Sequence, residues 1–203
     1  MGRARDLANI LSSSGNVALD SELGLSLITP TSIAATGGSG SISSTGAVSF
    51  TSASAISLNG VFSSTYTNYR IMFHATGASG NASITYRLRK DGSDASGSNY
   101  YRAGTFNYNN SSTISPLNAS GTSFNLVDIL AAAPNRTFLT IEASQTNNAT
   151  ETMHTFFSAA QNSTSSYAFQ GMGLHDLTIA YDGFTILFSA TSSGTVSVYG
   201  YRK

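Results

Sequence analysis

Apolar and polar residues alternate along most of the chain from residue 46 onward. In residues 69–74 and 84–89 an apolar side chain takes every second position, beginning with Tyr69 and Ile84. A period of two indicates β-strands that bury one face. The same pattern predicts further strands over residues 46–50, 55–62, 99–108, 122–130, 136–143, 152–159, 165–170, 173–181, 184–190 and 194–202.

Two Asp-Gly pairs indicate turns between these strands. Asp91-Gly92 and Asp182-Gly183 both combine residues that tolerate positive φ. The second pair separates two apolar runs closely enough to predict a tight hairpin. Short strands interrupted by regularly spaced turns are typical of an all-β sandwich, so we expect an all-β, jelly-roll-like β-sandwich over residues 46–203.

The first 45 residues follow a different pattern. Leu7, Ile10 and Leu11 repeat at three and four residues and predict a short helix over residues 3–11. Nine residues are too few for a helix that is stable alone in water, so we expect residues 1–24 to form an anchoring segment that docks on another protein. Residues 25–45 are rich in Ser, Thr and Gly and predict an extended arm or linker, with a short strand within residues 23–28.

The amino-acid composition argues against several classes of function. Ser, Thr, Asn and Gly make up close to half of the 203 residues, and charged residues only 10%. The formal net charge is zero, which gives no long-range attraction for nucleic acid or an anionic membrane. The absence of cysteine excludes disulfides and thiolate chemistry, and no apolar run reaches the roughly 20 residues of a membrane helix. We expect neither a signal peptide nor membrane insertion.

Motifs for enzymatic chemistry are weak. Gly37-Gly38-Ser39-Gly40 does not have the spacing of a nucleophile elbow, and Gly171-Met172-Gly173 lacks the third glycine of a nucleotide loop. His74, His154 and His175 are too far apart in sequence to predict a metal site. We therefore predict no cofactor and no metal.

A glycosidase would need two carboxylates facing each other across a substrate. Turns explain Asp91, Asp94 and Asp182. The remaining carboxylates that could serve are Asp128, Glu142, Glu151 and Asp176. Because none of these residues falls in a recognisable motif, we predict that the protein is not an enzyme and keep a glycan-modifying activity as the least favoured alternative.

Ligand binding has better candidates. Arg87 and Arg89 project from one side of their strand, and Arg70 and His74 from one side of another. If the two strands were neighbours, these side chains would form a small basic face for a phosphate or a sugar acid.

Aromatic residues offer a second candidate site among Asn and Ser residues. Tyr100, Tyr101, Phe106 and Tyr108 have the composition of a platform for stacking sugars. The same residues would suit a subunit interface, and the sequence leaves both interpretations open.

Five segments resemble structural proteins of tailed phages, particularly those that infect marine cyanobacteria. They are residues 1–9 (MGRARDLAN), 25–34 (LSLITPTSIA), 56–70 (ISLNGVFSSTYTNYR), 94–100 (DASGSNY) and 194–202 (GTVSVYGYR). The resemblance runs almost the whole length of the chain, and the segment over residues 56–70 is its most specific part.

The resemblance implies a virion protein of the tail-fibre kind, made in the host cytoplasm. Such proteins have a short amino-terminal anchor and a β-rich tip, and are commonly homotrimers. We therefore expect the partners to be other copies of the chain, other proteins of the capsid or tail, and a glycan of the host surface. The leading function is a short trimeric fibre or spike that contributes to host attachment, and the alternative is a capsid decoration protein that stabilises the shell.

Overall fold

The computed structural model describes residues 24–78, 82–109, 111–129, 136–161 and 166–201. Within these residues every regular element is a β-strand of an antiparallel sheet, and there is no helix. The predicted all-β class is confirmed. The helix expected over residues 3–11, with Leu7, Ile10 and Leu11, lies outside the described residues.

Fourteen strands follow one another along the chain. They are β1 (Leu25–Ile28), β2 (Ser32–Thr36), β3 (Ser39–Ile42), β4 (Val48–Asn59), β5 (Asn68–Ala78), β6 (Ala82–Lys90), β7 (Ser93–Asp94), β8 (Tyr100–Tyr108), β9 (Ser111–Gly121), β10 (Phe124–Ile129), β11 (Arg136–Ser144), β12 (Thr152–Gln161), β13 (Ser166–His175) and β14 (Gly183–Tyr201).

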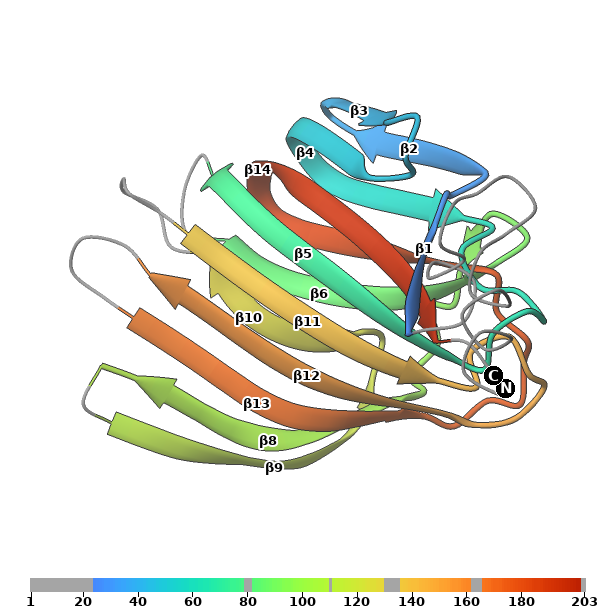
Figure 1. Cartoon of the computed structure of the whole chain (residues 1–203). Coiled ribbons are helices and arrows are strands. Elements are labelled where there is room, and N and C mark those ends of the chain that lie inside the picture. Colours follow the sequence, from blue (N-terminus) through green and yellow to red (C-terminus); the bar gives the residue numbers. More distant parts are fainter. Residues whose placement is uncertain (1–23, 79–81, 110, 130–135, 162–165, 202–203) are drawn as a thin grey trace, which may run out of the picture.

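The strands lie in two layers (Figure 1). The front layer has the order β5–β11–β12–β13–β8–β9, and β11, β12 and β13 form a meander in continuous register. The back layer contains β10, β6 and the first half of β14. β10 packs across from β12 and β13, and this contact brings the two layers together.

β14 connects the layers because it is long and bends. Its first half pairs with β6, and its second half, from Ser192 to Gly200, pairs with β5. β4 follows it along the other side and bends at the same place, where Ser52 has a positive φ of 52° and its N–H donates to Ser193 Oγ. The segments predicted as two strands over residues 184–190 and 194–202 are therefore one continuous strand.

Large apolar side chains fill the space between the layers. Phe73 and Phe188 stack with Phe50 at one end of this core. At the other end Tyr86, Phe124 and the imidazole of His154 pack against one another. Alternation of buried and exposed positions in β11 and β12 leaves the second face of the front layer outside the core.

The two predicted turns have different outcomes. Asp91 and Gly92 have positive φ values of 50° and 77° and join β6 to β7, so this hairpin is confirmed. The tight hairpin at Asp182-Gly183 is wrong, because β13 and β14 do not pair with each other. Gly183 instead allows close strand approach: a Cβ there would lie 2.2 Å from the carbonyl oxygen of Leu58.

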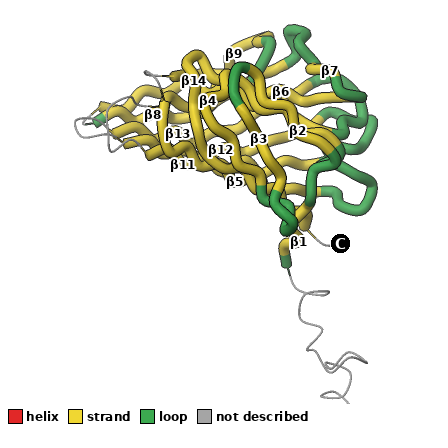
Figure 2. The backbone as a smooth tube through the Cα atoms, turned by 90° about the horizontal axis from the view of Figure 1, so that it is seen from above, coloured by secondary structure: helices red, strands yellow, loops and turns green. Residues whose placement is uncertain are grey.

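Residues 25–42 are hydrogen-bonded to the sheet. β1, the short strand expected within residues 23–28, pairs with the end of β14 and lies at one end of the molecule (Figure 2). β2 and β3 pair with the two halves of β4. This part of the expected arm extends the sheet edge.

Candidate functional site

The face of the front layer that points away from the core is the candidate functional surface. We call it the outer face: the outward side chains of β1, of the second half of β14, and of β5, β11, β12, β13 and β8. The register places Met72 opposite Thr140, Thr140 opposite Phe157, and Phe157 opposite Gln170, so these strands present one continuous surface.

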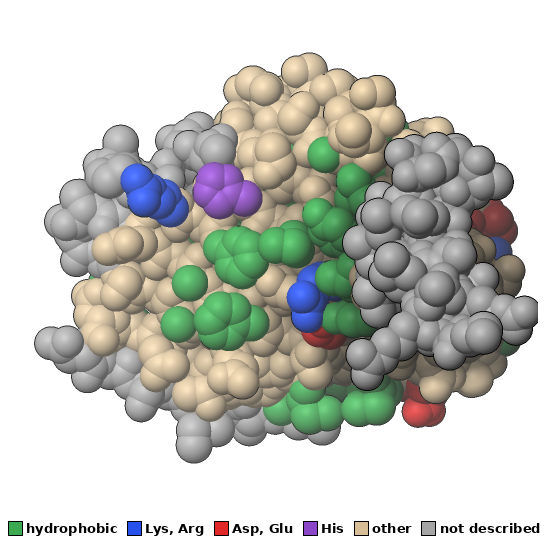
Figure 3. All heavy atoms as spheres, viewed as in Figure 1, with side chains coloured by type: hydrophobic (Ala, Val, Ile, Leu, Met, Phe, Trp, Pro, Cys, Tyr) green, Lys and Arg blue, Asp and Glu red, His purple; other side chains and the backbone are tan. Residues whose placement is uncertain are grey.

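Five large apolar side chains lie on the central strands of the outer face, and we call them the apolar patch. They are Met72, Phe138, Met153, Phe157 and Met172. Met153 is 53% exposed and Phe157 52%. Figure 3 shows apolar side chains gathered on this side of the molecule.

The patch is continuous across the strands. Met72 and Phe157 flank Thr140, and Phe138 lies one outward position away from Thr140 on the same strand. Met172 is a diagonal neighbour of both Phe157 and Met153. Side chains at such diagonal positions of a sheet are within reach of one another.

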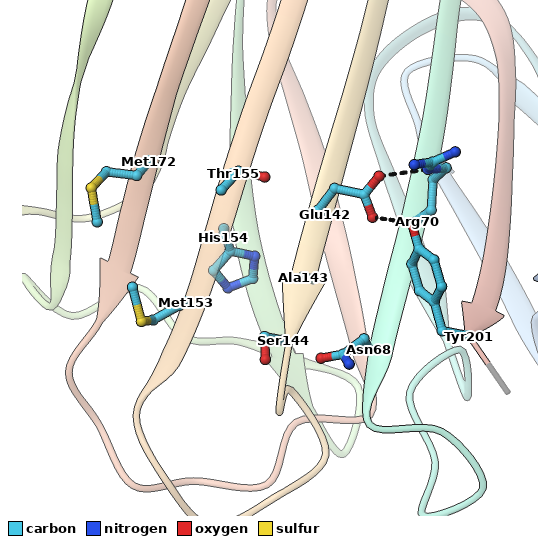
Figure 4. A pocket seen from close by; sticks show the side chains of 10 residues that line it. All are labelled: Asn68, Arg70, Glu142, Ala143, Ser144, Met153, His154, Thr155, Met172 and Tyr201. Carbon is cyan, nitrogen blue, oxygen red and sulfur yellow. Dashed lines mark hydrogen bonds and ion pairs between the residues drawn. The ribbon is translucent and has the colours of Figure 1, made fainter. Parts of the chain in front are cut away.

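A polar cluster lies beside the patch and consists of Arg70, Glu142 and Tyr201, here called the Glu142 cluster. Arg70 Nε donates to Glu142 Oε1 at 2.5 Å, and Tyr201 Oη donates to Glu142 Oε2 at 2.7 Å (Figure 4). The guanidinium carbon of Arg70 lies 5.7 Å from the centre of the Tyr201 ring. Three strands thus hold one carboxylate between two donors.

Two members of the cluster, Arg70 and Tyr201, remain protonated at neutral pH. The hydrogen bond to Glu142 raises the pKa of Arg70. Burial, followed by the hydrogen bond to Glu142, raises the pKa of Tyr201. Arg70 therefore remains a cation and Tyr201 remains a hydrogen-bond donor.

Two adjoining hollows lie on the outer face. The first, of about 570 Å³, is bordered by the Glu142 cluster together with Asn68, Met153 and Met172. The second, of about 520 Å³, is bordered by Phe157, Gln170 and Met172. They share Glu142, Thr155 and Met172, so the polar cluster and the apolar patch line one continuous depression.

The predicted basic face does not form. β14 separates β5 from β6, so Arg70 and His74 lie apart from Arg87 and Arg89. Arg87 Nε instead donates to the carbonyl oxygen of Thr122 at 2.9 Å.

Arg89 belongs to a structural network. Its guanidinium pairs with the carboxylate of Asp94 and donates to Asn59 Oδ1, Ser57 Oγ and Thr185 Oγ1. Thr185 Oγ1 in turn donates to Asp94 at 2.7 Å. These contacts leave the Arg89 side chain 12% exposed, and its charge is compensated inside the protein.

The predicted aromatic platform is divided between different environments. Tyr100 is a core residue: its ring is buried, and its hydroxyl donates to the carbonyl oxygen of Ala95 and accepts from the N–H of Leu88. The structure therefore places Tyr100 in the core and apart from Tyr101 and Tyr108. Tyr108 is more exposed and lies against the ring of Tyr167, with the ring centres 4.4 Å apart.

Tyr101 lies on the outer face, at the edge away from the Glu142 cluster. It interacts with the carboxylate of Asp176, which raises the pKa of its hydroxyl through their hydrogen bond. Asp176 also accepts from the side chain of Asn99 at 2.8 Å.

The other candidates for chemistry are dispersed. Glu151 lies in the connection from β11 to β12, and Asp128 lies in β10 opposite Ser83. His154 and His175 are buried in the core, whereas His74 is exposed on the outer face. In the part of the chain that the structure describes, no group of three His, Asp or Glu side chains could hold a metal, and no helix is long and apolar enough to cross a membrane.

Sequence reasoning missed Tyr201, Met153, Phe157 and Met172 as members of a surface. The adjacent pair Phe156 and Phe157 could have indicated an exposed aromatic residue. Two adjacent aromatic residues in one strand cannot both face the core, so one of them had to lie on the opposite face.

The sequence was also compared with known proteins. No protein-family model matches it, and neither does any curated protein.

Proposed function

We propose that this chain is a structural protein of a tailed-phage virion, a short homotrimeric fibre or spike that contributes to host attachment. The observation that carries the proposal is the apolar patch. Soluble monomers rarely leave a continuous apolar surface of this kind in water, and such surfaces usually belong to an assembly. The exposed patch is explained if the protein is one part of a larger particle.

The strand order supports the finer fold prediction of a jelly-roll-like β-sandwich. The back layer has the order β4–β14–β6–β10, and the front layer places the β11–β13 meander between β5 and β8–β9. This order supports a jelly roll in which three strands occupy the place of one. Jelly rolls are frequent in viral capsid proteins and lectins, and this frequency supports the proposal by analogy only.

The surface chemistry suits a particle outside the cell. A surface of Ser, Thr and Asn with 10% charged residues depends little on screened ion pairs, so it tolerates changes of salt. A chain without cysteine cannot be damaged by thiol oxidation.

The resemblance to phage structural proteins supplies the rest of the proposal. Residues 1–24, with Leu7, Ile10 and Leu11, would attach the chain to other virion proteins, residues 25–45 would form an arm whose strands are paired with the edge of the sheet, and residues 46–203 would form the outward domain. Tyr101, Tyr108 and Arg87 remain the candidates for contact with a host glycan.

The experiment is to locate the protein on purified particles with gold-labelled antibodies and to test the purified chain as a competitor of adsorption. A tail position and reduced adsorption of particles are expected. Uniform labelling of the capsid without competition would identify a decoration protein instead, and absence of the chain from the particles would contradict a virion role altogether.

The contribution of single residues is tested in particles that carry Tyr101→Ala or Arg87→Ala. Each substitution should reduce adsorption if the surface around that residue contacts the receptor; Tyr101 lies on β8 in the front layer and Arg87 on β6 in the back layer, so the two variants test different surfaces. Tyr100→Phe is the matched control, because Tyr100 is buried and keeps its ring in the core. Normal adsorption of an alanine variant would exclude the surface around that residue as the receptor tip.

A further inference from the structure

The exposed apolar side chains of the described residues are concentrated on one surface. Nine large hydrophobic side chains of the described residues are exposed, and of these nine Tyr108 and Ile179 lie off the outer face. Leu25 and Leu27 in β1 join the five residues of the apolar patch there, because they pair with Tyr201 and Tyr199 at the end of β14. Seven of the nine exposed side chains therefore lie on one side of one layer, which a random distribution over the surface would not produce.

The outer face has the size of a stable interface. Strands are spaced about 4.8 Å apart and rise about 3.3 Å per residue, so six neighbouring strands of nine residues cover on the order of 800 Å². The six are β14, β5, β11, β12, β13 and β8. Specific protein–protein interfaces bury about 800 Å² on each partner, so the whole outer face has the area of one such contact, and a copy in a ring of three would divide it between two contacts of about 400 Å² each.

The side chains of this surface also have the composition of an interface. Met, Phe, Tyr and Arg are enriched in interface centres, and Lys, Glu, Asp, Ser and Ala are depleted. The outer face departs from this pattern at Glu142, whose charge is paired with Arg70, and at Ser144 and Ser197. In the described residues no Lys or Asp occupies an outward position of these strands, and one of the two arginines there, Arg70, is paired with Glu142.

Charge favours a second copy of this chain as the partner. The ion pair of Arg70 and Glu142 is closed within one chain, so the centre of the outer face offers no unpaired charge to select an oppositely charged protein. The chain as a whole has zero formal net charge, so two copies approach without repulsion.

We propose that the outer face is the surface through which copies of this chain pack against one another, with the apolar patch at the centre of the contact. The inference rests on the proposed function, since it names the surface that holds the proposed oligomer together. Side chains of the neighbouring copy fill the two hollows, and the Glu142 cluster enters the contact already hydrogen-bonded.

The distribution of the patch fits a threefold arrangement. A closed ring of three needs two different surfaces on each copy that fit each other. The β5–β11 half of the outer face carries Met72 and Phe138, and the β12–β13 half carries Met153, Phe157 and Met172. One half of a copy can therefore contact the other half of the next.

The first test places a charge in the patch of the full-length chain. Phe157→Lys and Met172→Lys each bury an unpaired ammonium group if copies meet there, and both point away from the monomer core. The matched control is Ile179→Lys, which alters an exposed apolar residue in the connection from β13 to β14. We expect the two patch variants to fall to the mass of one chain by light scattering, the control to keep the wild-type mass, and all three to melt cooperatively.

The second test uses the absence of cysteine. Thr155→Cys places a single thiol at the centre of the outer face, and Ile179→Cys places one off it. We expect the thiol at position 155 to react slowly with a labelling reagent in the oligomer, and to react as fast as the thiol at 179 once Phe157→Lys is added.

The outcomes separate the inference from the proposed function. If the wild type is an oligomer that both lysine variants preserve, with fast labelling at 155, another surface holds the copies together and the inference is overturned while the virion role stands. If the wild type is a monomer, the inference is also overturned, and protection of position 155 only in particles would then assign the surface to a different virion protein. The virion role fails only if the chain is absent from particles, and the fibre or spike role fails if the antibodies label the capsid uniformly.

Discussion

Arg87 and Arg89 stand two residues apart on β6 and have very different surroundings. Arg87 is hydrogen-bonded to Thr122, at the edge of the layer. Arg89 is almost enclosed and pairs with Asp94 within a network of hydroxyl and amide groups. The side of a strand alone therefore does not decide whether a charge is available to a ligand.

Removal of Arg89 should destabilise the fold strongly. Arg89→Met leaves the carboxylate of Asp94 without its cation in a largely enclosed position, and breaking a buried pair in this way costs about 3 kcal/mol. Lys90→Met, which breaks the exposed contact with Asp91, should cost less than about 1 kcal/mol. Urea unfolding of the two variants compares these free energies, and equal losses would contradict the structural role of Arg89.

Two buried imidazoles make stability depend on pH. Burial lowers the pKa of His154 to about 3 and that of His175 to about 4. Among the described residues His154 Nδ1 and His175 Nε2 have no hydrogen-bond partner, so neither site favours the second proton of an imidazolium. Both residues are therefore neutral in the folded protein at neutral pH.

The sign of the effect follows from the two states. Below pH about 6.5 the unfolded chain binds protons on these imidazoles and the folded chain does not, so the free energy of unfolding falls as the pH is lowered toward about 4. His154→Phe should lose less stability than the wild type between pH 7.5 and 4.5. Thermal melting at a series of pH values measures this, and parallel curves for the two proteins would contradict the assignment.

The corner formed by β4 and β14 is the element that joins the two layers. Gly194 lies at this corner, where a Cβ would come within 2.1 Å of the carbonyl oxygen of His74. The bend therefore needs close contact between β14 and β5 as well as the positive φ of Ser52 in β4.

Gly194→Ala should disturb this corner. Because the clash is with backbone, the neighbouring strand must shift, and overpacking of this kind costs about 1–3 kcal/mol. Gly97→Ala is a suitable control, since the nearest atom to its Cβ is the side-chain oxygen of Asn99, which can rotate away. Equal thermal midpoints for the two variants would show that the corner tolerates a side chain.

Strand identity was largely predictable from the period of two, whereas strand continuity was not. Residues 184–190 and 194–202 read as two strands because Ser192, Ser193 and Gly194 resemble a turn. In the structure β5, β6 and β4 pair on both sides of this segment and keep it extended. Non-local pairing therefore outweighed the local turn preference, as it did at Asp182-Gly183.

The candidate surface was less predictable than the strands. Arg70 was recognised as a surface residue, but its partner Glu142 is 72 residues away and becomes a neighbour only through the pairing of β11 with β5. Tyr100 and Tyr101 were grouped together, although alternation along β8 places the first in the core and the second outside. Strand order supplies this information, and a single sequence does not contain it directly.

At the scale of the whole molecule, the apolar patch and the zero net charge point to association without strong electrostatics. An oligomer held together by such an interface should keep its mass when the salt concentration is raised from about 0.1 M to about 1 M, because screening weakens only exposed charge pairs. Light scattering at the two salt concentrations tests this. Dissociation at high salt would indicate that ion pairs, rather than the apolar patch, hold the copies together.

The most direct test of the account is the solution mass of the full-length wild-type chain. One chain has a mass of 21.1 kDa, so gel filtration followed by light scattering separates the possible states clearly. We predict three times the mass of one chain, with the outer faces in contact. A mass of one chain at every concentration tested would contradict it, and would leave the apolar patch as a surface for some other partner.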